Sequence, residues 1–213
     1  MICKYYSSYY NTNTLHFICQ PSIFPINKSM DYNSFTHGPI QSKIWLCEQL
    51  EPLIPDRATV AILGSWYNIL GFMMLTRNAK LYQSILGIDI DQSTLEIADN
   101  INQGWMIGSD AKLHNTIADV NATDLQGFTV IINCSPEHMK SNQWFDNIKL
   151  GTLVCLQSSN IDSINDGWNI TNPNRTIEEF TQKYPLSHYI IKETKDITYN
   201  DWGYKRFMII GVK

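Results

Sequence analysis

Two strand-like runs stand near the C-terminal end of the sequence, LSHYIIKET at residues 186–194 and YKRFMIIGV at residues 204–212. The polar segment that joins them is too short for the helix that a crossover between parallel strands needs. We therefore predict that the two runs form an antiparallel hairpin at one edge of a sheet.

Upstream of this hairpin, short apolar runs alternate with helical patterns. The predicted buried strands are TVAIL (59–63), SILGIDI (84–90), LHNTIA (113–118), FTVIINC (128–134) and GTLVCLQS (151–158). The predicted helices cover about residues 39–50, 69–75, 93–102, 142–148 and 176–183. Ser93 is expected to cap its helix, with Glu96 as the capping-box partner. This alternation predicts an open, mostly parallel sheet wound by right-handed crossovers.

The size and charge of the chain limit its organisation and its partners. With 213 residues it is long enough for one full-sized domain. We expect this domain to span residues 39–213, preceded by an arm or lid at residues 1–38. The formal net charge is -4, so no overall positive field attracts nucleic-acid phosphates. Nucleic acid is therefore a less expected partner, although the aromatic N-terminal arm leaves room for one base.

The cysteines and the hydropathy pattern point to a reducing compartment. The five cysteines, Cys3, Cys19, Cys47, Cys134 and Cys155, are widely spaced and form no CxxC pair. Free thiols are expected rather than a disulfide framework or a zinc site. The sequence shows neither the apolar core of a signal peptide nor a stretch that would span a bilayer. We expect a soluble cytoplasmic protein with no membrane partner; its oligomeric state stays open.

Ligands of open α/β sheets bind at the carboxyl ends of the strands, so the residues there are the candidates for a site. After the first strand come Gly64, Ser65, Trp66 and Tyr67. A glycine here permits a tight turn and a close approach of a ligand to the backbone. The alternative is a plain turn between strand and helix.

The second strand ends in an acid, Asp89, followed by Ile90 and Asp91. An acid at this distance after the glycine turn can accept hydrogen bonds from the ribose hydroxyls of a nucleoside. Asp91 is expected to begin the next helix, where its charge suits the helix dipole. The alternative for Asp89 is an ordinary exposed acid.

The densest group of reactive side chains follows the fourth strand, in the run Asn-Cys-Ser-Pro-Glu-His-Met at residues 133–139. Glu137 and His138 are candidate general bases. Cys134 and His138 also suggest a thiol nucleophile with its base, but no third orienting group is evident. One His with one Glu and one Cys is too sparse for a metal site.

The order of elements resembles the class I S-adenosylmethionine-dependent methyltransferases over about residues 40–213. The runs GSWY (64–67) and NCSxEHM (133–139) together resemble an uncharacterised methyltransferase-like group of bacteria and phages. The resemblance implies a doubly wound, mostly parallel seven-stranded Rossmann-like sheet with a C-terminal antiparallel hairpin, and S-adenosylmethionine as cofactor. Departures from the family pattern are Ile62 at the usual acid position, Trp66 and Asn68 at glycine positions, and Cys134-Ser135-Pro136 after Asn133.

The resemblance also assigns parts of the cofactor to residues. The turn after the first strand would hold the methionine part, Asp89 the ribose and Asp119 the adenine amino group, while the loop after the fourth strand receives the methyl acceptor. The cofactor residues it implies are Gly64, Ser65, Trp66, Tyr67, Asp89, Ile90, Asp119, Val120 and Asn133, and the catalytic residues are Asn133, Ser135, Glu137 and His138.

Two charged residues have candidate roles that the sequence does not decide. Lys43, with Gln41, is a candidate polar contact for the methionine end of the cofactor. Arg206, at the start of the last strand, could meet an anionic substrate, but a surface salt bridge is the favoured interpretation.

The leading functional prediction is a methyltransferase for a small molecule or a protein side chain. One alternative keeps the cofactor but changes the reaction, to aminocarboxypropyl transfer or donor cleavage. Another is a non-catalytic, virion-associated protein that retains the fold. A nicotinamide-dependent dehydrogenase ranks last, because GxGxxG is absent and the closing hairpin does not belong to that fold.

Overall fold

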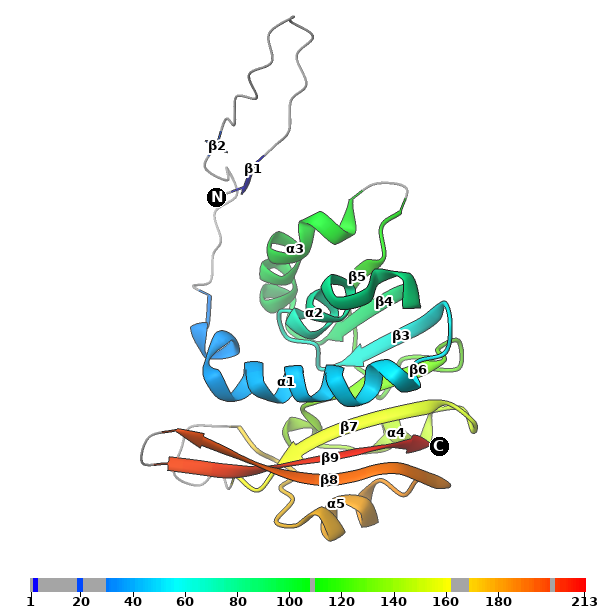
Figure 1. Cartoon of the computed structure of the whole chain (residues 1–213). Coiled ribbons are helices and arrows are strands. Elements are labelled where there is room, and N and C mark those ends of the chain that lie inside the picture. Colours follow the sequence, from blue (N-terminus) through cyan, green and yellow to red (C-terminus); the bar gives the residue numbers. More distant parts are fainter. Residues whose placement is uncertain (1, 4–18, 21–29, 108–109, 162–168, 200–201) are drawn as a thin grey trace, which may run out of the picture.

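The computed structural model describes residues 2–3, 19–20, 30–107, 110–161, 169–199 and 202–213 (Figure 1). The short strands β1 (Ile2–Cys3) and β2 (Cys19–Gln20) pair with each other in antiparallel fashion. Most of the segment 1–38, predicted to be an arm or lid, lies outside the described residues. None of the described helices has the length and apolar character needed to cross a membrane.

One seven-stranded sheet organises the rest of the chain, in the order β5-β4-β3-β6-β7-β9-β8. The strands are β3 (Ala58–Leu63), β4 (Tyr82–Asp89), β5 (Leu113–Ile117), β6 (Val130–Asn133), β7 (Leu153–Ser159), β8 (His188–Tyr199) and β9 (Trp202–Val212). Strands β3 to β7 pair in parallel, whereas β9 is antiparallel to both of its neighbours, β7 and β8. The predicted seven-stranded, mostly parallel sheet with a C-terminal antiparallel hairpin is confirmed.

Helices cover both faces of this sheet (Figure 1). They are α1 (His37–Leu50), α2 (Ile69–Asn78), α3 (Gln92–Met106), α4 (Gln143–Asp146) and α5 (Ile177–Lys183), with short 3-10 turns at Tyr32–Phe35, Glu51–Leu53, Ala79–Leu81 and Pro136–His138. Side chains of β3 alternate between two cores, as the period of a strand requires. Val60 and Ile62 pack with α1 and α2, and Ala61 and Leu63 pack with α4 and α5.

The start of α3 corrects one prediction. The cap is Asp91 rather than Ser93, and the helix begins at Gln92. The Asp91 carboxylate accepts from Ser93 N at 2.9 Å and from Thr94 N at 3.4 Å. A carboxylate satisfies two free amides of the first turn and also suits the dipole, so it replaces the serine hydroxyl as cap.

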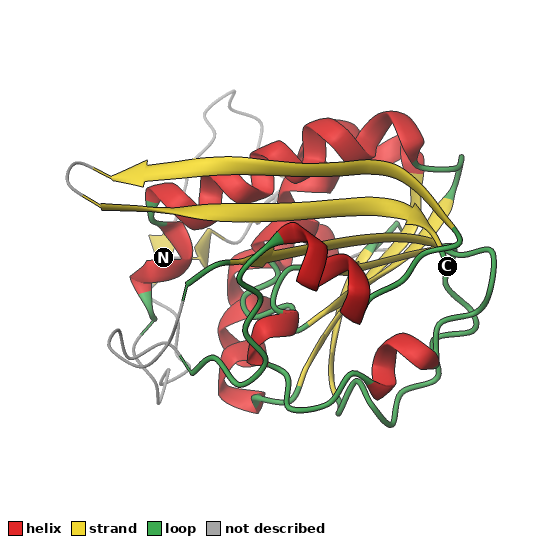
Figure 2. Ribbon diagram, turned by 90° about the horizontal axis from the view of Figure 1, so that it is seen from below, coloured by secondary structure: helices red, strands yellow, loops and turns green. Residues whose placement is uncertain are grey.

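The closing hairpin is longer than predicted, because pairing continues through the polar segment. Lys195 lies opposite Arg206, and Asp196 lies opposite Lys205 with an ion pair of 2.9 Å. Such cross-strand pairs sustain a ladder without an apolar pattern. Figure 2 shows this hairpin running past the ends of the other strands.

Candidate functional site

The turn after β3 has left-handed backbone at every second residue: φ is +63° at Gly64, +51° at Trp66 and +49° at Asn68. Glycine reaches this conformation without a steric cost, whereas other residues lose about 1–2 kcal/mol. The Trp66 amide donates to Asp89 Oδ2 at 2.8 Å, and this bond ties the turn to the end of β4. Trp66 and Asn68 thus adopt a conformation that glycines commonly supply.

Asn68 is a fully buried structural residue of this turn. Its Nδ2 donates to Asn115 Oδ1 at 2.8 Å. A Cβ at Gly71 would lie 2.5 Å from Asn68 Oδ1, and a Cβ at Gly87 would lie 2.4 Å from Asn68 Nδ2. The two glycines therefore leave the space that the Asn68 side chain fills.

The acids predicted to hold a nucleoside lie at the carboxyl ends of β4 and β5. Asp89 Oδ2 accepts from Trp66 N, and Oδ1 accepts from Asp91 N at 3.1 Å, so each oxygen keeps one further lone pair for a ligand. Asp119 is exposed and accepts from Asn121 N at 2.9 Å.

The apolar neighbours of these acids differ in exposure. Ile90, next to Asp89, is 73% exposed, and Ile117, at the end of β5, is 54% exposed. Val120 is buried against the core. The exposed side chains of Ile90 and Ile117 thus lie at the carboxyl ends of the same two strands as the two acids.

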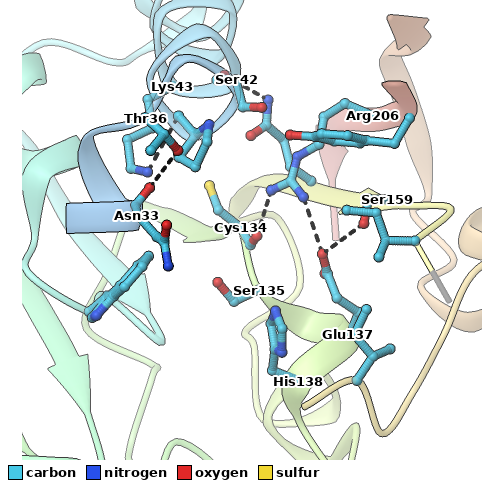
Figure 3. A pocket seen from close by; sticks show the side chains of 16 residues that line it. Asn33, Thr36, Ser42, Lys43, Cys134, Ser135, Glu137, His138, Ser159 and Arg206 are labelled. Atoms are coloured by element: carbon cyan, nitrogen blue, oxygen red, sulfur yellow. Dashed lines mark hydrogen bonds and ion pairs between the residues drawn. The ribbon is translucent and has the colours of Figure 1, made fainter. Parts of the chain in front are cut away.

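A cavity of about 330 Å³ lies beside this edge, between α1, the turn after β3, the loop after β6 and the ends of β7 and β9 (Figure 3). Of the predicted site residues, Trp66, Ser135, Glu137 and His138 line it. Asp89 and Asp119 do not. One group of predicted residues therefore lies in the cavity, and another lies apart from it along the ends of β4 and β5.

A second, smaller hollow of about 40 Å³ reaches from the cavity region to the turn after β3. Gly64, Ser65 and Tyr67 line it. Lys43, Trp66, Cys134 and Ser135 line both hollows. These four residues form the wall that the two share.

Asn133 anchors the loop after β6 rather than lining the cavity. It is fully buried, its Oδ1 accepts from Ser135 N at 2.9 Å, and its Nδ2 lies 3.3 Å from Met139 Sδ. Its amide therefore fixes the turn that presents Ser135 and Glu137. Its assignment to the cofactor and the acceptor stays a prediction.

Glu137 and Arg206 form an ion pair inside the molecule. Arg206 Nη1 lies 3.1 Å from Glu137 Oε1, and Nη2 donates to Cys134 O at 2.6 Å. The Arg206 side chain is only 11% exposed and the Glu137 side chain 4%, so the favoured prediction of a surface salt bridge at Arg206 is wrong. Register explains the difference: Arg206 pairs with Ser159 at the carboxyl end of β7, which places it inside the site.

His138 is held in one orientation by a backbone carbonyl. Its Nδ1 lies 3.0 Å from Asn169 O. Because a carbonyl oxygen only accepts, Nδ1 must carry the hydrogen in the neutral ring, which leaves Nε2 as a proton acceptor. The histidine is exposed and lines the cavity.

Burial shifts the pKa of two further groups at the cavity. It lowers the pKa of Lys43 to about 8, with the Arg206 charge acting in the same direction. It raises the pKa of the Cys134 thiol, which keeps the sulfur protonated and speaks against a thiolate nucleophile. Among the described residues, no group of three or more His, Cys, Asp or Glu side chains is placed to hold a metal ion.

Several lining residues were absent from the sequence predictions. Asn33 and Thr36 come from the segment before α1, and Gln157 and Ser159 from the end of β7. The last two had a recognisable signal, because they are polar residues at the carboxyl end of an otherwise apolar strand. Asn33 and Thr36 belong to no motif and reach the site only through the fold.

The sheet order and the position of the site define the class: this is the α/β fold of the S-adenosylmethionine-dependent methyltransferases. No protein-family model matches the sequence, and neither does any curated protein. Solved structures do match in fold. The N-methyltransferase NodS from Bradyrhizobium japonicum WM9, in complex with S-adenosyl-L-homocysteine, superposes with a TM-score of 0.65 at 9% identity, over 87% of this chain and 93% of that one.

Two other solved structures superpose similarly. Magnesium protoporphyrin IX methyltransferase (ChlM) from Synechocystis PCC 6803, with bound SAM, gives a TM-score of 0.61 at 10% identity, over 87% of this chain and 88% of that one. A putative RNA methyltransferase from Pyrococcus horikoshii gives 0.56 at 13% identity, over 81% and 83%. At such identities the likeness is one of fold.

Proposed function

We propose that the protein is an S-adenosylmethionine-dependent methyltransferase whose acceptor binds in the 330 Å³ cavity. The observation that carries the proposal is the shared wall, in which Lys43, Trp66, Cys134 and Ser135 line both the cavity and the small hollow at Gly64. A donor at the glycine turn and an acceptor in the cavity would meet across this wall. Holding two reactants at such a junction supplies much of the rate enhancement that methyl transfer needs.

The residues at the strand ends fit the nucleoside part of the cofactor. Asp89 has lone pairs for ribose hydroxyls, and the open side chains of Ile90 and Ile117 offer apolar surface to a purine ring. The fold neighbours bound to S-adenosyl-L-homocysteine and SAM support this assignment. The GSWY and NCSxEHM runs remain the support for placing the chain in a bacterial and phage group.

The bound cofactor would supply a methyl group on a positively charged sulfur. A lone pair of the acceptor would form the bond to this carbon as the carbon–sulfur bond breaks, and the electron pair of that bond would stay on sulfur in S-adenosylhomocysteine. In this proposal His138 Nε2 receives the acceptor's proton, because Nδ1 is committed to Asn169 O. Ser135, in the shared wall, helps to orient the acceptor.

Calorimetric titration with S-adenosylhomocysteine tests the proposal. We expect binding that weakens at least about tenfold in Asp89→Ala. The matched control is Asp56→Ala, which removes an exposed acid before β3 at the opposite edge of the sheet. Absence of binding at millimolar ligand would refute the cofactor. Products identified by mass spectrometry then decide the reaction: methylthioadenosine released without an acceptor would favour donor cleavage over methyl transfer.

A further inference from the structure

The cavity carries one positive charge for which the described residues provide no counter-charge. Glu137 neutralises Arg206 across 3.1 Å. Lys43, in contrast, makes no ion pair with a described residue, and its hydrogen bond goes to Pro39 O at 3.4 Å. A partly buried ammonium without a counter-charge is costly, so an anion in the cavity would be stabilised there.

Other polar atoms around the cavity also lack partners. Arg206 Nε, Gln157 Oε1 and Ser42 Oγ are buried without a hydrogen bond, and all three side chains line the cavity. Buried polar atoms in folded proteins are almost always paired, so several unpaired ones in one wall indicate a site for a polar ligand. Figure 3 shows Lys43 entering from α1 and Arg206 from β9, with Cys134 between them.

Size and charge narrow the class of ligand. A volume of about 330 Å³ is near the lower end for small-molecule sites and too small for a macromolecular segment of any length. A single uncompensated ammonium matches a monoanion better than a dianion. Pro39, Trp66, Ile161 and Ile170 add apolar lining.

We propose that the methyl acceptor is a small carboxylic acid with an apolar body, whose carboxylate binds Lys43 in this cavity. This inference rests on the proposed function in one respect, namely that the bound acid is a methyl acceptor. The carboxylate site itself is argued from the charges in the cavity and does not depend on the proposed function. Lys43 is a binding residue here. Of the unpaired atoms around the cavity, Arg206 Nε and Ser42 Oγ can donate to a carboxylate, whereas Gln157 Oε1 only accepts and makes no bond to it.

Benzoate and benzamide make a matched pair of probes, because they share size and shape and differ in charge. In calorimetric titrations of the protein, with and without saturating S-adenosylhomocysteine, we expect benzoate to bind at least about tenfold more tightly than benzamide. Lys43→Met should abolish this preference. Lys80→Met should keep it, because Lys80 is exposed at the far edge of the sheet, before β4.

Three results would overturn the proposal. Equal binding of benzoate and benzamide would remove the anion site, and tighter binding of phenyl phosphate than of benzoate would replace the carboxylate by a phosphate. If Lys43→Met weakened S-adenosylhomocysteine and left benzoate unchanged, Lys43 would hold the donor's own carboxylate instead. A protein that prefers benzoate but never binds S-adenosylhomocysteine would refute the proposed function and leave the carboxylate site intact.

Discussion

Arg206 on β9 and Glu137 in the loop after β6 are joined by a buried ion pair, Nη1 to Oε1, of 3.1 Å. The pair links segments 69 residues apart in the chain and, through Arg206 Nη2 and Cys134 O, fixes the loop that lines the cavity. Because the pair is buried, water screens these two charges poorly, and each charge is stabilised mainly by the other. The site is therefore built by the last strand as much as by the strand that precedes the loop.

Glu137→Gln should lower the free energy of unfolding by about 3–5 kcal/mol, because it leaves the Arg206 charge buried and unpaired. Asp196→Asn is the control: it breaks the exposed ion pair between Asp196 on β8 and Lys205 on β9 and should cost less than about 1 kcal/mol. Urea denaturation measures both. The double variant Glu137→Gln/Arg206→Met should cost less than the sum of its single changes, and simple additivity would contradict the coupling.

Gly64→Ala should destabilise the protein by about 1–2 kcal/mol, since φ is +63° and the new Cβ would lie 3.1 Å from Met139 Cε. Gly104→Ala should instead stabilise it by about 0.5–1 kcal/mol, because Gly104 lies within α3 and the added Cβ would meet nothing within 4 Å apart from the backbone of its own helix and its chain neighbours. Thermal and urea unfolding measure whether each substitution lowers or raises the stability of the protein. A stabilising Gly64→Ala would mean that the turn does not need its left-handed residue.

The sequence was sufficient for most of the fold, because buried parallel strands are short apolar runs and each carries its own signal. The alternation with helices predicted a mostly parallel sheet, and the short connection before the last strand predicted the antiparallel hairpin, whereas the order of the strands within the sheet comes from the structure. The ends of the elements were harder to predict. Asp91 displaced Ser93 as cap through a local competition between two good caps, and the hairpin grew through charged cross-strand pairs that have no apolar period.

Site residues could be predicted from the sequence only where they follow directly after a predicted strand. Trp66, Ser135, Glu137 and His138 follow strand ends and were found there. Arg206 was misjudged because its burial depends on the register of β9 against β7, a contact between distant segments.

His138→Gln should lower methyl transfer about 10²–10⁴-fold while leaving S-adenosylhomocysteine affinity unchanged, because Nε2 is the proposed proton acceptor. His114→Gln, at an exposed position of β5, is the matched control. Single-turnover formation of S-adenosylhomocysteine with the acceptor, followed by mass spectrometry, measures the effect. Full activity of His138→Gln would show that the acceptor loses its proton elsewhere or reacts already deprotonated.

Lys43→Met should raise the free energy of unfolding at pH 7 by about 1 kcal/mol, the kind of gain expected when a functional residue is removed. The pKa of Lys43 is about 8 in the folded protein against an ordinary 10.5. Burial is the main cause of the lower pKa; Cys134 acts in the opposite direction, the Arg206 charge lowers the pKa further, and Cys47 raises it.

The sign of the pH dependence follows from these values. Below pH 8 the amine is charged in both states, and the folded protein bears the full cost of burying it. Between pH 8 and 10.5 only the unfolded chain holds the proton, so the stability of the wild type rises with pH. The advantage of Lys43→Met should therefore shrink across this window. Burial raises the pKa of the Cys47, Cys134 and Cys155 thiols, so at the lower end of this window they stay protonated in both folded proteins, and their contribution cancels there in the difference between the two urea denaturation series. A difference that stays constant with pH would show that Lys43 is not held in a medium that disfavours its charge.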